Sequence, residues 1–524
     1  MPCFCYLCLG SLRRHPRQAV LRQKKGTLTA CRTILFNHKH TMIESSTPIP
    51  SVDAVLRIFR RLNDIPRPSH HEERVADFLC QYAERLGLAY RRDNNNCVVI
   101  SKPATPGHEN ATPVAVLNHM DMVCVGMEKP TEQAVVPYED NGWLKARGTS
   151  LGADNGIGLS MALAVLADDS IVHGPLEVIT TTNEEDGMSG AAGLSRDFLR
   201  ARKVINLDSE DYDTITTGAA GAYLQMHRLP SPLQKAPEGK RRWFRISIEG
   251  GKGGHSGVDI NKGRASAVVV AWAVLAAIYN EYDVELADIR VGEANASIAS
   301  SAEMIITVPS GEAAEFVKSQ EEMLNNWLKE EYGSNEPTMH CTIEKVEARK
   351  TILPTEAFEA LMTCLEQIPQ GVVKMSETMA DTVETSNNVG RIFVDDGHLV
   401  VTTHTRSFIY DDMVALGKEI AEVFAQEGGT SELVMAAPAW QEKQDSDFLR
   451  LTSDTFDEVL GWRPRMVAMH FVLEAGYFVN TYPGIEIACI GPRIIEPHST
   501  AERVELSTVG DIWKVFVTLL GKMA

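Results

Sequence analysis

The chain has 524 residues, of which 44% are hydrophobic and 23% are charged, a composition typical of globular proteins. A single hydrophobic core rarely serves a chain of this length, so we expect two domains. The net charge of −19 would repel nucleic-acid phosphates, and apolar runs such as 268–279 are shorter than the roughly 20 residues of a membrane-spanning helix. We therefore expect neither a nucleic-acid nor a membrane partner.

Residues 1–41 form a basic leader, because eight Lys or Arg residues and no Asp or Glu precede Glu44. This composition is typical of a mitochondrial transit peptide. A disordered tail and translated upstream sequence, with the true start at Met42, remain as alternatives. The six cysteines beyond the leader are scattered without a CxxC pair, which favours a reducing compartment. We expect a cytoplasmic protein, or a mitochondrial one if the leader acts in targeting.

The region 42–225 alternates predicted helices and strands. A helix is predicted over 70–87, where Ser69 and Glu72 have the spacing of a capping box. Short apolar runs predict strands, and a helix-like stretch lies between the first two of them. These strands are 114–117, 176–179, 204–207 and, much later, 485–490, and the helix-like stretch is 156–166. The alternation predicts an α/β fold around a largely parallel sheet.

The region 226–441 has a different pattern of predicted strands, helices and loops, and it is predicted to be an inserted α+β domain. It begins with a polar linker, and a glycine-rich loop over 250–257 precedes a long helix that should start near Asn261. The other predicted elements are strands at 243–248, 304–308, 340–343, 391–394 and 399–403 and helices near 310–331 and 411–426. Residues 442–524 should then complete the first domain.

Histidines and carboxylates follow four of the predicted strands. His119 and Asp121 follow the first, Glu184 and Glu185 the second and Asp208 the third, while His498 lies eight residues beyond the last. In open α/β sheets, ligands bind outside the carboxyl ends of the strands, so these side chains should meet at one edge.

Asp154 adds another carboxylate at the glycine-rich turn 152–156, where the backbone can fold tightly. Two histidines with several carboxylates and no thiolate suit zinc or manganese. In the consecutive pair Glu184-Glu185, one carboxylate could bind metal while its neighbour handles a proton. The spacing of His119 and Asp121 lets a carboxylate hold the second imidazole nitrogen of a metal ligand.

Six motifs in this order resemble the co-catalytic zinc aminopeptidase and aminoacylase-like metallopeptidases, and above all the aminoacyl-histidine dipeptidase (Xaa-His dipeptidase) family. The resemblance runs from about residue 53 to the end of the chain. The motifs are His119-Met-Asp121, Gly152-Ala-Asp154-Asn-Gly156, Thr182-Asn-Glu184-Glu185, Asn206-Leu-Asp208, Gly253-Gly-His255-Ser-Gly257 and Gly491-Pro-Arg-Ile-Ile-Glu-Pro-His498.

The resemblance implies a zinc-peptidase-like catalytic domain (42–225 and 442–524) with a mixed central sheet flanked by helices. It also implies an inserted α+β lid, 226–441, that mediates a homodimer. Two Zn²⁺ ions per chain are implied, with Mn²⁺ or Co²⁺ as substitutes, and the substrate would be a small peptide.

The same resemblance assigns roles to residues. Asp154 would bridge the metals, with His119 and Asp208 completing one site and Glu185 and His498 the other. Glu184 would be the general base, and Asp121 would orient His119. His255 would stabilise the oxyanion, and Arg406 would meet the substrate carboxylate. Glu474 belongs to a segment, Met469 to Gly476, that resembles a family segment near the metals.

One stretch departs from the family pattern. Where the family usually has a sequence like Asn-Ala-Ile-Pro-Arg in the lid, this chain has Asn295-Ala-Ser-Ile-Ala-Ser300, which leaves open whether the segment contributes to the site. The predicted function is hydrolysis of Xaa-His dipeptides, carnosine-like substrates included. The alternatives are a tripeptidase, a carboxypeptidase or an N-acyl amino acid deacylase on the same machinery, and, more remotely, an inactive binding or scaffold homologue.

Overall fold

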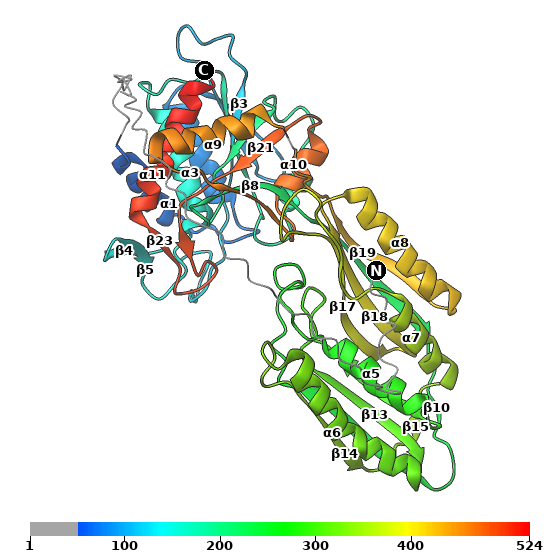
Figure 1. The fold of residues 1–524 in the computed structure, drawn as a ribbon. Helices are drawn as coiled ribbons and strands as arrows, with labels where there is room; N and C mark the ends of the chain where they lie inside the picture. Colours follow the sequence, from blue (N-terminus) through cyan, green and yellow to red (C-terminus); the bar gives the residue numbers. More distant parts are fainter. Residues whose placement is uncertain (1–50, 444) are drawn as a thin grey trace, which may run out of the picture.

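The computed structural model describes residues 51–443 and 445–524, so the predicted leader 1–41 lies outside the described residues. The described chain forms two large sheets in separate parts of the molecule, an eight-stranded one and a nine-stranded one (Figure 1). This arrangement confirms the predicted fold class, an α/β domain with an inserted α+β domain. No helix among the described residues is both long and apolar enough to span a membrane.

The eight-stranded sheet is mixed, with parallel strands at its centre. In spatial order its strands are β1 (Ala89–Arg92), β2 (Val98–Lys102), β6 (Leu176–Thr181), β3 (Val114–His119), β7 (Lys203–Asn206), β21 (Glu486–Cys489), β8 (Thr214–Ala219) and β20 (Arg465–Met469). β3 runs parallel to both β6 and β7, and β7 runs parallel to β21. The carboxyl ends of these four strands therefore meet at one edge, as the sequence predicts.

Helices cover both faces of this sheet. They are α1 (Asp53–Asn63), α2 (Glu73–Arg85), α3 (Ala153–Ala167), α9 (Asp447–Leu460) and α11 (Leu506–Lys522) on one face, and α4 (Ser189–Ala192) and α10 (Ala475–Thr481) on the other. Side chains alternate between the faces along each strand. Val114 and Val116 of β3 pack on the first set of helices, whereas Ala115 and Leu117 pack on the second.

The predicted capping box at the start of α2 does not form. Ser69 instead donates its hydroxyl to Asp121 Oδ2 at 2.8 Å, and the N-cap residue of α2 is Glu72. Glu72 Oε1 accepts the backbone N–H groups of His70 and Asn183 at 3.0 and 2.9 Å. The local pattern predicts that the Ser69 hydroxyl caps the helix, but it binds the carboxylate of Asp121, which is distant in sequence.

A small four-stranded sheet lies beside the first domain. Its strands, in spatial order, are β22 (Ile494–Ile495), β23 (Arg503–Glu505), β5 (Trp143–Ala146) and β4 (Pro137–Asp140). The antiparallel pairing of β23 with β5 places the segment after His498 next to the segment before Asp154.

The nine-stranded sheet is antiparallel, and α5 (Ala267–Tyr279), α6 (Glu312–Tyr332), α7 (Thr355–Gln367) and α8 (Tyr410–Gln426) pack on one of its faces (Figure 1). Its strands, in order, are β14 (His340–Val346), β11 (Arg241–Glu249), β13 (Ala302–Pro309), β12 (Glu285–Val291), β17 (Val383–Asp395), β18 (His398–Ser407), β9 (Gly221–Pro230) and β19 (Thr430–Ala437), and β16 (Gly371–Met375) pairs with β17. A short pair, β10 (Gln234–Lys235) and β15 (Thr351–Ile352), is separate.

The elements of this region differ from the expectation at two points. The helix expected near Asn261 begins at Ala267, because the hydroxyl of Ser266 accepts the N–H of Val268 as an N-cap. The chain leaves the eight-stranded sheet after Ala219 and enters the nine-stranded sheet at Gly221, returning after Ala437. We propose 226 and 441, the limits predicted from the sequence, as the bounds of the inserted domain. We call this domain the lid.

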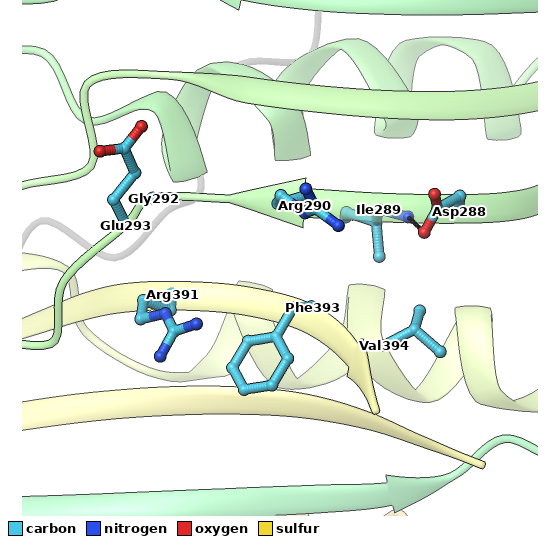
Figure 2. Close-up of a pocket in the computed structure, with 8 residues that line it drawn as sticks. All are labelled: Asp288, Ile289, Arg290, Gly292, Glu293, Arg391, Phe393 and Val394. Carbon is cyan, nitrogen blue, oxygen red and sulfur yellow. Dashed lines mark hydrogen bonds between the residues drawn. The ribbon is translucent and has the colours of Figure 1, made fainter. Parts of the chain in front are cut away.

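In the lid sheet, β12 and β17 pair over a short stretch. Two residue pairs connect them, Arg290 with Phe393 and Val291 with Ile392. A cavity of about 410 Å³ lies at this junction (Figure 2). Its charged lining includes Arg290 and Arg391, and the guanidinium of Arg391 lies 4.4 Å from the centre of the Phe393 ring. None of the site residues predicted from the sequence lines this cavity.

Candidate metal and catalytic site

The five predicted metal ligands converge at the carboxyl edge of the eight-stranded sheet. His119 is the last residue of β3, Glu185 and Asp208 follow β6 and β7, and His498 lies between β22 and β23. Asp154 lies in the first turn of α3. We call these five residues the ligand cluster.

The carboxylate of Asp154 lies between the two histidines. Its Oδ1 is 3.0 Å from His119 Nε2, and its Oδ2 is 3.1 Å from His498 Nε2. Asp208 Oδ1 lies 3.3 Å from His119 Nε2, and Glu185 Oε2 lies 2.8 Å from His498 Nε2. Each histidine is thus grouped with one terminal carboxylate and one oxygen of Asp154.

Asp121 fixes the surroundings of this cluster. Its Oδ1 lies 3.5 Å from His119 Nδ1 and accepts the backbone N–H of Glu184 at 3.1 Å. Its Oδ2 accepts the N–H of Glu185 at 3.2 Å and the hydroxyl of Ser69. One buried carboxylate therefore orients both the imidazole and the turn that carries the consecutive glutamates.

The ligand cluster and the carboxyl groups around it contain more negative charge than its two histidines can neutralise. Burial raises the pKa of Asp208 to about 6 and that of Glu474 to about 8, and neighbouring carboxylates add to both shifts. Burial and neighbouring carboxylates also raise the pKa of Glu184 well above its ordinary value. Glu185 Oε1 is buried without a hydrogen-bond partner among the described residues. Bound cations would supply the missing positive charge, so this donor set fits divalent metals.

Three members of the ligand cluster form a compact group. Ligand atoms of His119, Asp154 and Glu185 all lie within 4.8 Å of one another. Asp154 is shared by both histidine groups, which is the arrangement that a bridging carboxylate requires.

The two residues predicted to contact substrate, His255 and Arg406, lie together in the lid. His255 Nδ1 accepts the N–H groups of Gly257 and Val258 at 3.2 and 3.1 Å, which leaves Nε2 3.5 Å from Arg406 Nη2. Arg406 is buried, and its Nη2 also lies 3.4 Å from Ser256 Oγ. Burial and Arg406 lower the pKa of His255 to about 4, so the imidazole is neutral at neutral pH. We call His255, Ser256 and Arg406 the lid cluster.

The hydrogen bonds of the lid cluster, as the described residues show them, do not reach the ligand cluster. The segment from His470 to Glu474 connects the two regions. His470 Nε2 pairs with Ser386 Oγ in β17 at 2.8 Å, and a Cβ on Gly257 would lie 2.0 Å from the His470 carbonyl. Glu474, only 3% exposed, interacts electrostatically with His119 at the other end.

The segment Asn295 to Ser300, which departs from the family pattern, lies next to the lid cluster. Ser297 forms an isolated antiparallel β-bridge with His255. The carbonyl of Ser297 accepts a hydrogen bond from Asn388 Nδ2 at 2.9 Å. Asn295 Oδ1 is buried without a hydrogen-bond partner among the described residues.

Sequence reasoning missed two charged residues behind the cluster. Arg67 and Glu502 are both buried and hydrogen-bond to the loop that carries Asp154. Arg67 stands between two prolines and Glu502 in an ordinary polar stretch, so no local pattern marks either as buried. The only available signal was position, because Glu502 lies four residues after His498.

Comparisons with known proteins agree with this geometry. Residues 115–522 match the model of peptidase family M20/M25/M40. The chain belongs to this family. It is 34% identical over 467 residues to the cytosol non-specific dipeptidase of Escherichia coli K12, a match that covers 88% of this chain and 96% of that protein. The predicted resemblance is thereby confirmed.

Solved structures give the same result. The aminoacylhistidine dipeptidase of Vibrio alginolyticus superimposes with a TM-score of 0.84 at 33% identity, covering 90% of this chain and 97% of that one. The aminopeptidase PepT of Bacillus cereus shares the fold alone, with a TM-score of 0.55 at 16% identity and coverage of 91% and 100%.

Proposed function

We propose that this M20 peptidase is a dipeptidase that uses two metal ions, with zinc as the native metal and Mn²⁺ or Co²⁺ as substitutes. The observation that carries the proposal is the Asp154 carboxylate, whose Oδ1 lies next to His119 and whose Oδ2 lies next to His498. A carboxylate shared in this way is suited to bridge two cations. When bound, the ions supply Lewis acidity and activate a water at neutral pH.

His119 and Asp208 would hold one ion, and His498 and Glu185 would hold the other, with Asp154 common to both. This assignment follows the two groups of short distances in the structure. Asp121 is the positioning residue for His119, since it lies against the second imidazole nitrogen.

Glu184 is the general base in this proposal. Its backbone N–H is held by Asp121, next to the ligand Glu185. Burial raises the pKa of its carboxyl, which suits a group that takes a proton from water and returns it to the leaving amine. A positioned general base typically contributes about 10²–10⁴-fold to the rate.

The lid cluster would recognise the peptide. Arg406 offers a planar fork for the substrate carboxylate, and neutral His255 can donate a hydrogen bond to the oxyanion. A dipeptide places its carboxylate one residue from the scissile bond, so a fixed guanidinium can select for length. We propose Xaa-His dipeptides, carnosine-like ones included, as substrates, a preference that the name of the similar Vibrio alginolyticus aminoacylhistidine dipeptidase supports. The name of the similar Escherichia coli enzyme, a non-specific dipeptidase, supports dipeptides in general.

The deciding experiment compares Ala-His, Ala-Leu, Ala-Ala-His and N-acetyl-His as substrates of metal-loaded wild-type enzyme. We expect Ala-His to give the highest kcat/KM. A best rate on Ala-Ala-His would replace the proposal with a tripeptidase, and a best rate on N-acetyl-His would replace it with a deacylase.

We also propose a homodimer formed through the lid and a cytoplasmic location. Light scattering should give twice the chain mass, and a monomer would refute the dimer. A chain that begins at Met42 should match the full chain in activity. A fluorescent fusion of residues 1–41 tests the mitochondrial alternative, which a diffuse signal would remove.

A further inference from the structure

The loop that presents Asp154 is held from one side by the carboxylate of Glu502. Glu502 Oε2 accepts the N–H groups of Leu151 and Gly152 at 2.7 and 3.0 Å. Its Oε1 accepts the N–H groups of Ala153 and Asp154 at 2.8 and 3.4 Å. Four consecutive backbone donors therefore point at one side chain, which is 3% exposed. Moving this carboxylate would move the whole loop.

Arg67 holds the same loop from the other side. Its Nη2 donates to the carbonyl of Gly152 at 2.6 Å, and its Nη1 donates to the carbonyls of Asp121 and Met120 at 2.8 and 3.2 Å. The side chain is 1% exposed. The planar guanidinium thus joins the Asp154 loop to the residues directly after His119.

Two glycines of the sequence motif make room for Arg67. A Cβ on Gly152 would lie 2.6 Å from Arg67 Nη2, and a Cβ on Gly156 would lie 2.7 Å from the same atom. Gly152 also has a φ of +67°, which side-chain-bearing residues rarely adopt. The glycine spacing of this motif therefore fits the passage of the guanidinium as well as the turn itself.

The two charges act across a single peptide unit. The unit that joins Gly152 to Ala153 donates the Ala153 N–H to Glu502 and accepts from Arg67 through the Gly152 carbonyl, so its dipole lies between a buried anion and a buried cation. Neither charge has a direct ion-pair partner in the described part of the chain. Buried charges contribute little to net stability, so a role in fixing geometry explains this arrangement better.

Each of the two residues also connects the loop to one histidine of the ligand cluster. Arg67 binds the carbonyls next to His119, and Glu502 belongs to the loop that carries His498. Resting on the proposed two-metal function, we infer that Arg67 and Glu502 are positioning residues that set the Asp154 carboxylate between the two metal sites. Neither belongs to the ligand cluster, and each acts through the loop that carries Asp154.

The test measures zinc affinity by competition with a chromophoric chelator. Glu502→Gln keeps the shape but offers one acceptor oxygen in place of two, and Arg67→Lys keeps the charge but cannot bridge Gly152 to Asp121. We expect each to weaken zinc binding by about 10–100-fold, the usual effect of removing an outer hydrogen-bond partner of a metal ligand. The visible spectrum of the cobalt-loaded protein should shift as well.

Matched controls come from the same domain. Glu177→Gln removes a buried carboxylate oxygen that accepts the N–H groups of Arg200 and Ala201, at the opposite edge of the sheet. Arg91→Lys changes an arginine that binds the carbonyls of Asp197 and Phe198. Both should leave zinc affinity within twofold of wild type. Should Glu502→Gln fail to fold, Glu502→Asp, which keeps the charge and withdraws it by one methylene, replaces it.

A double variant distinguishes an effect on the position of Asp154 from a general loss of structure. With Asp154→Ala already present, Glu502→Gln should change the affinity of the remaining zinc by less than twofold. A full tenfold loss there, or unchanged affinity in the wild-type background, would overturn the inference. Wild-type protein that binds no zinc would instead refute the proposed function, so the two failures are distinguishable.

Discussion

The ligand cluster and the lid cluster are both polar and largely shielded from solvent, with His498 the exposed member of the first, yet they are stabilised in opposite ways. In the ligand cluster several carboxylates surround two histidines, and burial raises the pKa of Asp208 and of the neighbouring Glu184. In the lid cluster one guanidinium faces a neutral imidazole whose other nitrogen accepts two local N–H groups. The first needs added cations, whereas the second presents a cation for an anionic ligand.

This difference separates the chemistry of the site from the recognition of substrate. The groups that would activate water are on the eight-stranded sheet, and those that would bind the peptide carboxylate are in the lid, joined by the segment from His470 to Glu474. Variants in the two regions should therefore fail in different ways.

Metal removal should have the largest effect and should be confined to one region. We expect chelation to abolish activity and zinc to restore it, because the excess carboxylates then lack their counter-charge. Hydrogen exchange should rise at 151–155 and 183–186 but not at 255–258 or 403–407. Full activity in metal-free protein would contradict the mechanism, and equal exchange changes in both regions would contradict the separation.

Substitution of Glu184 or Glu185 should have the next largest effect, and kcat and metal content should distinguish the two residues. Glu184→Gln should lower kcat by about 10²–10⁴-fold while metal content stays at the wild-type level. Glu185→Gln should lose metal as well as activity, since its carboxylate is grouped with His498. Elemental analysis beside steady-state kinetics checks both, and the reverse pattern would show that the two roles are exchanged.

Arg406→Ala should affect substrate recognition alone. Loss of a charge-assisted contact worth about 1.5–3 kcal/mol should lower kcat/KM for Ala-His by about 10–100-fold. C-terminally amidated Ala-His should change little, and metal content should stay at the wild-type level. An equal loss on both peptides would show that the arginine supports the fold rather than the carboxylate.

The smallest effect concerns stability in acid. Although burial favours the neutral form, hydrogen bonds from Lys203, Lys443 and Ser446 lower the pKa of Glu486 from 4.5 to about 2. The stabilisation is present above pH 4.5 and is lost as the pH falls from about 4.5 to about 2. We expect about 1–3 kcal/mol, measured by denaturant unfolding across this window.

Glu486→Gln should flatten that part of the stability profile. The matched change in the lid is Glu432→Gln, which removes an exposed ion pair with Arg228 and should leave the profile unchanged. A profile that is equally steep in wild type and Glu486→Gln would show that other carboxylates control the acid transition.

Much of the fold follows from local patterns. The apolar runs at 114–117, 176–179 and 204–207 match β3, β6 and β7, the last run extending one residue beyond its strand, and the alternation of their side chains accounts for the two helix-covered faces. The helices expected near 310–331 and 411–426 match α6 and α8 within two residues. Helix starts were less predictable, since Ser69 bonds Asp121 and Ser266 caps α5 later than expected.

The sequence alone also determined which residues could form the ligand cluster. Parallel strands place the residues after them at one edge, so chain order sufficed to group His119, Glu185 and Asp208. Tertiary structure decided that Arg67 and Glu502 hold the Asp154 loop, a contact between residues up to 351 positions apart. The physical reason is that a buried charge is stabilised by whichever polar groups the fold brings to it, and local sequence does not encode those partners.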